Sequence, residues 1–286
     1  RLLKKTGGVP TLPELGLRGK ALINLQESIL RPHGIILITG PTGSGKTTTL
    51  YSILSRLNAT SVNIVTLEDP IEYQIAGVNQ VQVNPQAGLT FASGLRSFLR
   101  QDPNIIMVGE IRDAETADLA IQASLTGHLV FSTLHTNSSA GALPRLLDMH
   151  AEPYLIASTV TCVLAQRVVR KICPSCKIQG KITDEITADL KKVLGSLWDF
   201  NKNKLVLYEG KGCPECNSTG FQGRVGIYEV LVITEKISRL ILIRETAQTI
   251  ENTAISEGMI TMKQDGYLKV MEGVTTLAEV LRVAQE

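Results

Sequence analysis

The feature that most constrains this chain is a glycine-rich loop between an apolar run and a polar helix start. Residues 34–50 read GIILITGPTGSGKTTTL. The apolar run predicts a strand, and the residues from Thr47 onward predict a helix. Between them lies the pattern G-x-x-x-x-G-K-[ST], whose glycines let successive backbone N–H groups face phosphate oxygens. Because a helix N-terminus also favours anions, the stretch predicts a nucleotide phosphate site.

Two residues of this loop have separate expected roles. Lys46 is expected to reach the β- and γ-phosphates of ATP, and the Thr47 hydroxyl is expected to ligate Mg²⁺. The whole nucleotide-binding set is Gly40, Pro41, Thr42, Gly43, Ser44, Gly45, Lys46, Thr47 and Thr48. An ordinary glycine-rich turn is the alternative, but the motif, the strand and the helix agree with one another.

Composition limits the class of protein. The 286 residues are 43% hydrophobic and 20% charged, as in one large or two ordinary globular domains. A net charge of +2 and an aromatic content of 4% give no reason to expect nucleic acid binding.

No apolar run approaches the ~18–20 residues that a membrane span needs. The most apolar long segment, 154–169, is predicted to be a helix interrupted by polar residues. The chain begins with Arg1, so we expect further residues upstream.

Apolar and amphipathic stretches alternate along the first half of the chain. Strands are predicted at 35–39, 63–67, 105–108 and 128–133, and helices at 21–30, 47–57, 90–100 and 114–125. The strands are continuously apolar, which is typical of a parallel sheet covered on both faces. In such an α/β fold, ligands bind at the carboxyl ends of the strands. The segments that follow the strands should therefore gather around the glycine-rich loop.

Two of these segments are acidic. Glu68, Asp69 and Glu72 follow the second strand, where they would position water or metal beside Mg·ATP. An acidic surface turn is the alternative. Glu110 follows the third strand, and an apolar strand that ends in an acid is the Walker B arrangement, in which the acid holds Mg²⁺.

Two histidines border the fourth strand. His135 follows it and is a candidate sensor of the γ-phosphate or of a neighbouring subunit. His128 precedes it, after Gly127, and is the weaker candidate because it would simply begin the strand. A structural role is the alternative for both.

Four of the five cysteines form two C-x-x-C pairs, Cys173 with Cys176 and Cys213 with Cys216. Two such pairs separated by 36 residues are typical of a structural Zn²⁺ site with four thiolate ligands. Two disulfides, or four separate thiols, are the alternatives. Cys162 stands apart in the apolar segment and is expected to be a buried small hydrophobe.

The remaining sequence predicts mostly short helices. Helices are expected at 183–194, 235–243, 247–257, 262–271 and 277–284, and strands at 205–208 and 224–233. Thr276 and Glu279 fit a capping box at the start of the last helix.

The motifs together resemble the GspE/PilB family of ATPases, which drive type II secretion and type IV pilus assembly. The matching stretches are GPTGSGKTTTLY (40–51), LEDPIEY (67–73), NQVQVNP (79–85), LRSFLRQDPNIIMVGEIRD (95–113), TGHLVFSTLHTN (126–137), LAQRVVRKICPSCK (164–177), GCPECNSTGFQGRVGIYEVL (212–231) and GVTTLAEVLRV (273–283). The resemblance covers nearly the whole chain.

This resemblance implies the roles of several residues. Glu72 would be the catalytic glutamate, Glu110 the Walker B acid, and His128 and His135 the family's conserved histidines. The family works as a hexamer on the cytoplasmic face of the inner membrane, where ATP hydrolysis drives extrusion of pseudopilin or pilin. Its partners are an inner-membrane platform and cytoplasmic adaptor proteins. It also carries a preceding domain that supplies arginines.

The expected organisation has four parts. Residues 1–33 are a lead-in, 34–170 a RecA-like ATPase core, 171–220 a zinc module and 221–286 a C-terminal helical subdomain.

A guanidinium from a neighbouring protomer can stabilise charge on a transferring phosphoryl group. The candidates for that role are Arg96, Arg100, Arg112, Arg145 and Arg224.

Three other functions fit parts of the pattern. A pilus-retraction motor shares the core motifs, although by resemblance the four-cysteine module belongs to the assembly and secretion branch. A DNA-translocating motor is disfavoured by the balanced charge. A nucleotide-gated scaffold without turnover is disfavoured by the complete set of Lys46, Thr47, Glu72 and Glu110.

Overall fold

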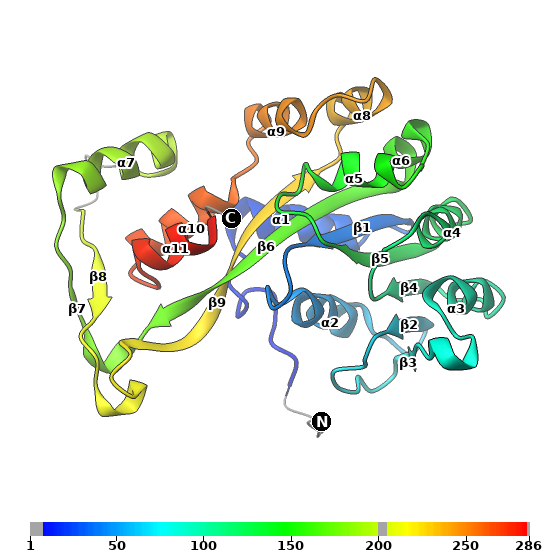
Figure 1. Cartoon of the computed structure of the whole chain (residues 1–286), viewed down its shortest axis with the longest axis horizontal. Helices are drawn as coiled ribbons and strands as arrows, with labels where there is room; N and C mark the ends of the chain where they lie inside the picture. Colours follow the sequence, from blue (N-terminus) through cyan, green and yellow to red (C-terminus); the bar gives the residue numbers. More distant parts are fainter. Residues whose placement is uncertain (1–7, 200–204, 285–286) are drawn as a thin grey trace. The chain divides into compact units, whose positions relative to one another are not determined.

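The computed structural model describes residues 8–199 and 205–284 (Figure 1). The chain divides into two compact units, and each unit consists of two separate stretches. Unit 1 comprises Arg1–Ala165 and Val230–Met259, and unit 2 comprises Gln166–Glu229 and Ile260–Glu286.

Unit 1 has the alternating order of an α/β protein. Its elements are α1 (Gly19–Ile29), β1 (Gly34–Thr39), α2 (Lys46–Leu57), β2 (Ile64–Glu68), β3 (Asn79–Gln82), α3 (Phe91–Phe98), β4 (Ile105–Val108), α4 (Ala114–Leu125), β5 (Leu129–Leu134), α5 (Ala142–Asp148), α6 (Pro153–Thr159), α8 (Glu235–Leu242) and α9 (Ala247–Ser256). Two long strands, β6 (Val160–Ile172) and β9 (Phe221–Val232), each include residues of both units.

The sheet has seven strands in the order β3-β2-β4-β5-β1-β6-β9. Strand β1 pairs in parallel with β5 and β6, β2 pairs in parallel with β3 and β4, and β4 pairs in parallel with β5. Every residue of β1, β2, β4 and β5 is buried. The prediction of parallel strands covered on both faces is confirmed for these four strands, whose continuous apolar runs leave no face suited to water.

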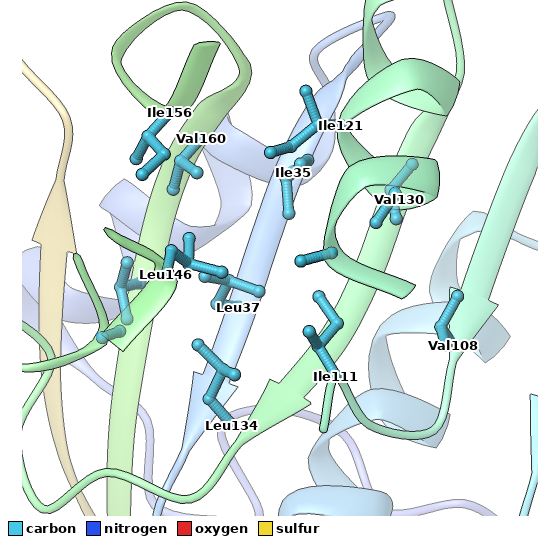
Figure 2. Packing of buried hydrophobic residues seen from close by; sticks show 14 of the residues in the cluster. Ile35, Leu37, Val108, Ile111, Ile121, Val130, Leu134, Leu146, Ile156 and Val160 are labelled. Carbon is cyan, nitrogen blue, oxygen red and sulfur yellow. The ribbon is translucent and has the colours of Figure 1, made fainter. Parts of the chain in front are cut away.

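The core of unit 1 forms between the sheet and its helices (Figure 2). Ile35 and Leu37 of β1 and Val130 of β5 share a cluster with Ile121 of α4, which contacts both strands. Helices α8 and α9 contribute Ile237, Ile241, Ile250 and Ala254 to this same cluster. These two helices therefore belong to the core of unit 1.

The predicted helix at 154–169 is wrong. Helix α6 ends at Thr159, and β6 begins at Val160. The first eight residues of β6 are all buried, and a strand buried on both faces has the same unbroken apolar pattern as a buried helix. Cys162 is fully buried, as expected, but it lies in this strand. Strand β3 and helix α5 were not predicted.

Unit 2 contains the cysteine pairs and the last two helices. Its elements are β7 (Lys177–Gln179), α7 (Asp184–Leu194), β8 (Tyr208–Gly210), α10 (Met262–Met271) and α11 (Leu277–Ala284). β7 and β8 pair antiparallel, and α10 contacts both α7 and α11. The predicted strand at 205–208 overlaps β8 only at Tyr208, since 205–207 are not in a strand. Residues 200–204 lie outside the described ranges.

The compact units do not follow the four predicted parts of the chain. Residues 221–286, expected as one helical subdomain, are divided between the units, since α8 and α9 fall in unit 1 and α10 and α11 in unit 2. The physical reason is that apolar residues of α8 and α9 are buried in the core cluster of unit 1. Sequence order alone does not indicate which core a helix will join.

Glu279 anchors α11 within unit 2. Its side chain is 3% exposed and accepts hydrogen bonds from the Arg170 backbone N–H at 3.0 Å and from the Arg170 guanidinium at 2.7 Å. Arg282 donates to it as well, at 3.1 Å. One of the two bonds of the predicted capping box is present, since Thr276 Oγ1 accepts from the Glu279 N–H at 3.3 Å. The Glu279 carboxylate, which would form the other bond, binds the two arginines instead. Burial opposes ionisation of Glu279, but the arginine bonds outweigh it and lower the pKa to about 2.

This depressed pKa predicts an acid dependence of stability. A carboxyl whose pKa is lower in the folded state stabilises the fold above its ordinary pKa of 4.5 and loses that effect as the pH falls towards about 2. The Glu279→Gln variant should be less stable at neutral pH and should lose less of its unfolding free energy over this interval. The measurement is urea unfolding as a function of pH, followed by fluorescence of Trp198, the only tryptophan, which lies in unit 2.

Glu185→Gln on α7 is the matched control, because Glu185 is exposed and in the same unit. It should keep the parent pH dependence. Parallel pH profiles for the parent and Glu279→Gln would contradict the assignment.

Candidate functional site

The glycine-rich loop follows β1, a central strand of the sheet. Gly43 and Gly45 have φ values of +80° and +86°, in the left-handed region that strongly favours glycine. Helix α2 begins directly afterwards at Lys46. Gly45, the residue before the helix, has no side chain to cap the first turn, and the N-terminus of a helix favours an anion.

Lys46 folds back over this loop. Its Nζ donates to the carbonyl oxygen of Gly40 at 2.8 Å and to that of Pro41 at 3.2 Å. Thr47 and Thr48 are half-buried beside it, and Ser44 is buried. The loop, the lysine and the threonines lie together as the motif predicts.

The carboxyl ends of β1, β4 and β5 meet at one edge because these strands are parallel and in register. Thr39 is opposite Leu134, and Val108 is opposite Ser132. The segment after β4 is fixed to β5, since the Ile111 N–H donates to the Thr133 carbonyl at 3.0 Å. Gly109 gives the backbones a close approach here, as a Cβ at this position would lie 3.0 Å from the Leu67 carbonyl oxygen.

Glu110 lies at this edge with two basic partners. Its side chain is 13% exposed, and its carboxylate forms an ion pair with Arg112 and lies 3.4 Å from Nε2 of His135. The hydrogen bond to Glu110 raises the pKa of the Arg112 guanidinium above its ordinary value. The structure therefore brings Glu110 and His135 together, as expected, and adds Arg112 to them.

Glu68 is a buried carboxylate at the end of β2. It is 3% exposed and accepts a hydrogen bond from the Tyr51 hydroxyl, one from Thr66 Oγ1 at 2.6 Å and one from Gln80 Nε2 at 3.0 Å. These three donors fix the side chain inside the protein. The interpretation of Glu68 as one of three acids facing a ligand is therefore wrong, because this carboxylate is directed into the fold.

The loop after Glu68 carries the other two acids. Asp69 is exposed and Glu72 is half-buried. The backbone N–H of Glu72 donates to the Tyr51 hydroxyl oxygen at 3.2 Å. Burial, followed by the bond to Glu68, raises the pKa of Tyr51 well above its usual range. The tyrosine is therefore a neutral hydroxyl that donates to Glu68 and accepts from Glu72.

Sequence reasoning missed Tyr51, Thr66 and Gln80. One signal was present for Tyr51, which stands one helical turn after Thr47 on the helix that begins at the phosphate loop. Thr66 and Gln80 give no such signal, because a polar residue in a strand is as often solvated as bonded.

His128 does not join this site within the chain. It directly precedes β5, and its Nδ1 lies 2.8 Å from the Ala123 carbonyl and 3.1 Å from the Thr126 hydroxyl. Since β5 has six residues, which span about 20 Å, His128 and His135 stand at opposite ends of the strand.

The five arginine candidates are all exposed. Arg112 pairs with Glu110, and Arg96 of α3 forms an ion pair with Glu115 of α4. Arg100 and Arg145 belong to unit 1 and Arg224 to unit 2. Among the described contacts of these five, only those of Arg112 reach a predicted site residue.

The four paired cysteines form a compact cluster in unit 2, with all four Sγ atoms within 4.8 Å of one another. The Sγ of Cys173 lies 3.9 Å from that of Cys213, and the Sγ of Cys216 lies 3.8 Å from that of Cys176 and 3.7 Å from that of Cys213. Disulfide sulfurs are about 2.05 Å apart, so none of these pairs is bonded. Four ligands placed tetrahedrally about 2.3 Å from Zn²⁺ are about 3.8 Å apart, so the cluster fits this ion.

Backbone donors surround the sulfurs. The N–H groups of Gly212, Cys213 and Gly220 donate to cysteine sulfurs at 3.3, 3.2 and 3.3 Å. Burial opposes ionisation of Cys216, but the N–H groups of Cys213 and Gly220 outweigh it and lower its pKa to about 6, whereas burial raises the pKa of Cys176 to about 12. A divalent cation would favour the thiolate form of all four side chains.

A parallel α/β sheet with a phosphate-binding loop after a central strand and an acid after a nearby strand defines a P-loop nucleotide-binding protein. A family model described as "Type II/IV secretion system protein" matches residues 1–282, and the chain belongs to this family. The family expected from the motifs is therefore confirmed.

Named relatives agree with this assignment. The chain is 50% identical over 287 residues to the type II secretion system ATPase E of Vibrio cholerae, covering 100% of this chain and 55% of that protein. It is 48% identical over 281 residues to the type IV pilus assembly ATPase PilB of Thermus thermophilus, covering 98% of this chain and 31% of that protein. The chain thus spans about half or less of the length of these relatives.

Solved structures share the fold. The pilus retraction motor PilT with bound ADP superimposes with a TM-score of 0.72 at 30% identity, over 100% of this chain and 69% of that one. The ATPase DotB of Legionella pneumophila gives 0.68 at 27% identity, over 97% of this chain and 66% of that one. Among the described residues, none of the helices combines the length and the apolar character needed to cross a membrane.

Proposed function

We propose that this chain is the ATP-hydrolysing part of a motor for type II protein secretion or type IV pilus assembly. The observation that carries the proposal is the shared sheet edge, where Lys46 and Thr47 begin α2 and Glu110 follows β4. Relatives named as ATPases of these two systems are 50% and 48% identical to it.

The residues divide the work of phosphoryl transfer. Lys46 and the first N–H groups of α2 bind and orient the phosphates. Thr47 and Glu110 would hold Mg²⁺, which neutralises charge on the phosphate oxygens. Glu72 orients the attacking water and accepts its proton, and its backbone is held by Tyr51. His135 and Arg112 both contact the Glu110 carboxylate. A ligand bound by Glu110 would therefore change both contacts.

The proposal includes assembly into a hexamer. Ring closure uses two different faces of each protomer, so an exposed arginine of one protomer can face the nucleotide of the next. Arg96, Arg100, Arg145 and Arg224 are the exposed candidates for this role, and His128 would act only through such a contact. We place the hexamer in the cytoplasm, bound to the inner membrane through platform and adaptor proteins.

The competing functions differ in testable ways. A retraction motor is disfavoured because the retraction motor PilT is 30% identical, against 50% and 48% for the secretion and assembly relatives. Sequence identity does not distinguish a secretion motor from a pilus assembly motor. Identifying the inner-membrane protein that co-purifies with the chain would distinguish them. A scaffold that binds ATP without turnover is tested directly by measuring hydrolysis.

We also propose that the four-cysteine cluster holds one structural Zn²⁺. The sulfur spacing of 3.7–3.9 Å supports this assignment, as does the set of backbone N–H donors. All four ligands would come from the protein, which leaves no open position for catalysis.

The first prediction tests the phosphate site. Lys46→Ala should abolish ATP hydrolysis and greatly weaken nucleotide binding, because the ammonium group would bind the β- and γ-phosphates. Steady-state hydrolysis and binding of a fluorescent ATP analogue measure the two effects. Lys236→Ala on α8, an exposed lysine 3.4 Å from Glu257, is the control and should behave as the parent. Near-normal turnover in Lys46→Ala would contradict the assignment of the phosphate site.

The second prediction separates binding from chemistry. Glu72→Gln should bind Mg·ATP as the parent does, but should turn over at least ~10²-fold more slowly, the scale of a general-base effect. Glu235→Gln, an exposed acid on α8 paired with Arg239, is the control. This role is contradicted if Glu72→Gln loses its affinity for ATP but keeps normal turnover per bound nucleotide.

The third prediction concerns the metal. Purified reduced protein should contain one Zn²⁺ per chain, and Cys213→Ser should lose it and become less stable. Cys162→Ala removes the fifth cysteine, which lies in β6 outside the cluster, and should keep the full zinc content. Elemental analysis and thermal unfolding are the measurements. A parent protein free of zinc, or one with two disulfides under reducing conditions, overturns the proposal.

A further inference from the structure

A buried polar network connects the phosphate-loop helix to the loop that carries Glu72. Tyr51 lies on α2, one turn beyond Thr47, and is fully buried. Its hydroxyl donates to Glu68 and accepts from the Glu72 backbone N–H at 3.2 Å. One side chain on the helix that begins at Lys46 therefore contacts the backbone of the proposed catalytic glutamate.

The same loop is held at further points by Gln80 of β3. Its Oε1 accepts from the Ile75 N–H at 2.7 Å, and its Nε2 donates to the Tyr73 carbonyl at 3.1 Å and to Glu68 at 3.0 Å. The Tyr73 ring also packs edge-to-face on the Tyr51 ring, with centroids 4.5 Å apart. The loop backbone around Glu72 is therefore specified by side chains that do not face the nucleotide.

Burial makes this network sensitive to a single atom. Glu68 is 3% exposed and Tyr51 is not exposed, so neither partner can exchange a lost bond for water at no cost. If the Tyr51 hydroxyl is removed, the Glu68 carboxylate loses one of its three donors and the Glu72 N–H loses its acceptor. The backbone at Glu72 then has one fewer restraint towards α2.

We propose that Tyr51 and Glu68 are positioning residues for ATP hydrolysis, which hold the backbone of Glu72 at a fixed place relative to the phosphate loop. Neither residue contacts the nucleotide, and both act through Glu72. The inference rests on the proposed function, since it assigns Glu72 the task of orienting water. It adds a physical link between the helix that binds phosphate and the residue that performs the chemistry.

The test uses Tyr51→Phe, which removes one oxygen and keeps the ring packed against Tyr73. Binding of Mg·ATP should stay within about two-fold of the parent, while kcat should fall about 10- to 100-fold, as for a misplaced catalytic group. Exchange of the peptide amides around Glu72 should become faster in the nucleotide-free protein. A purely structural role would not separate kcat from binding in this way.

A matched control comes from unit 2, where Tyr267 is also fully buried and donates to Asp189 at 2.5 Å. Tyr267→Phe removes a tyrosine–carboxylate bond away from the site, to an Asp189 side chain that is 40% exposed. It should lower the melting temperature but leave kcat and the exchange of the Glu72 loop unchanged. Equal losses of kcat in Tyr51→Phe and Tyr267→Phe would overturn the proposal.

A double-mutant cycle tests whether Tyr51 acts through Glu72. Tyr51→Phe should cost nothing further in a Glu72→Gln background, because the group it positions is already inactive. Additive losses would overturn the proposal. If Tyr51→Phe does not fold, the isosteric Glu68→Gln replaces it, since the amide would turn a donor towards the Tyr51 hydroxyl and disturb the same bond.

Different results contradict the proposed function and the positioning role of Tyr51. If the parent protein hydrolyses ATP and Lys46→Ala does so equally well, the proposed function is contradicted. The positioning role of Tyr51 is then tested by amide exchange alone. Unchanged amide exchange around Glu72 in Tyr51→Phe would overturn it. Lys46-dependent hydrolysis with parent-like kcat in Tyr51→Phe leaves the function intact and overturns the inference.

Discussion

The site depends above all on the parallel pairing of β1 with β5 on one side and β6 on the other. This pairing buries every residue of β1 and fixes the point at which the chain leaves the sheet at Gly40. Because β4 and β5 run in the same direction, the segments that carry Glu110 and His135 leave at the same edge. A register shift of one residue would reverse the faces of the apolar side chains, so the core also fixes the site.

A second constraint is the buried polar network around Glu68. The Tyr51–Glu68 bond joins α2 to β2, and Gln80 joins β2 to the loop before β3. A buried polar network costs free energy unless every member has a partner, and within this one the donors and acceptors match. Its presence beside the glycine-rich loop gives the Glu72 segment a defined backbone where loops are usually mobile.

The sequence predicted the elements of the core with short boundary errors and failed where burial hides periodicity. Strand β4 and helices α4, α10 and α11 begin and end as expected. The stretch 154–169 was read as a helix because a strand buried on both faces lacks the alternation that identifies strands. Strand β3 was missed for the opposite reason, since its NQVQ sequence is largely polar and none of its residues is buried. Both errors come from reading local pattern without the neighbours that decide it.

The sequence by itself determined the chemistry proposed for the two candidate sites. The glycine-rich loop with Lys46 and Thr47, the acid Glu110 after an apolar strand, and the two C-x-x-C pairs are short patterns whose spacing reflects the ligand. The tertiary structure decided which acids face the site, since Glu68 turns inward to three donors while Glu72 stays in the loop, and it placed His128 at the far end of β5. It also decided that α8 and α9 join the core of unit 1. These outcomes depend on contacts between residues distant in sequence, which no local pattern records.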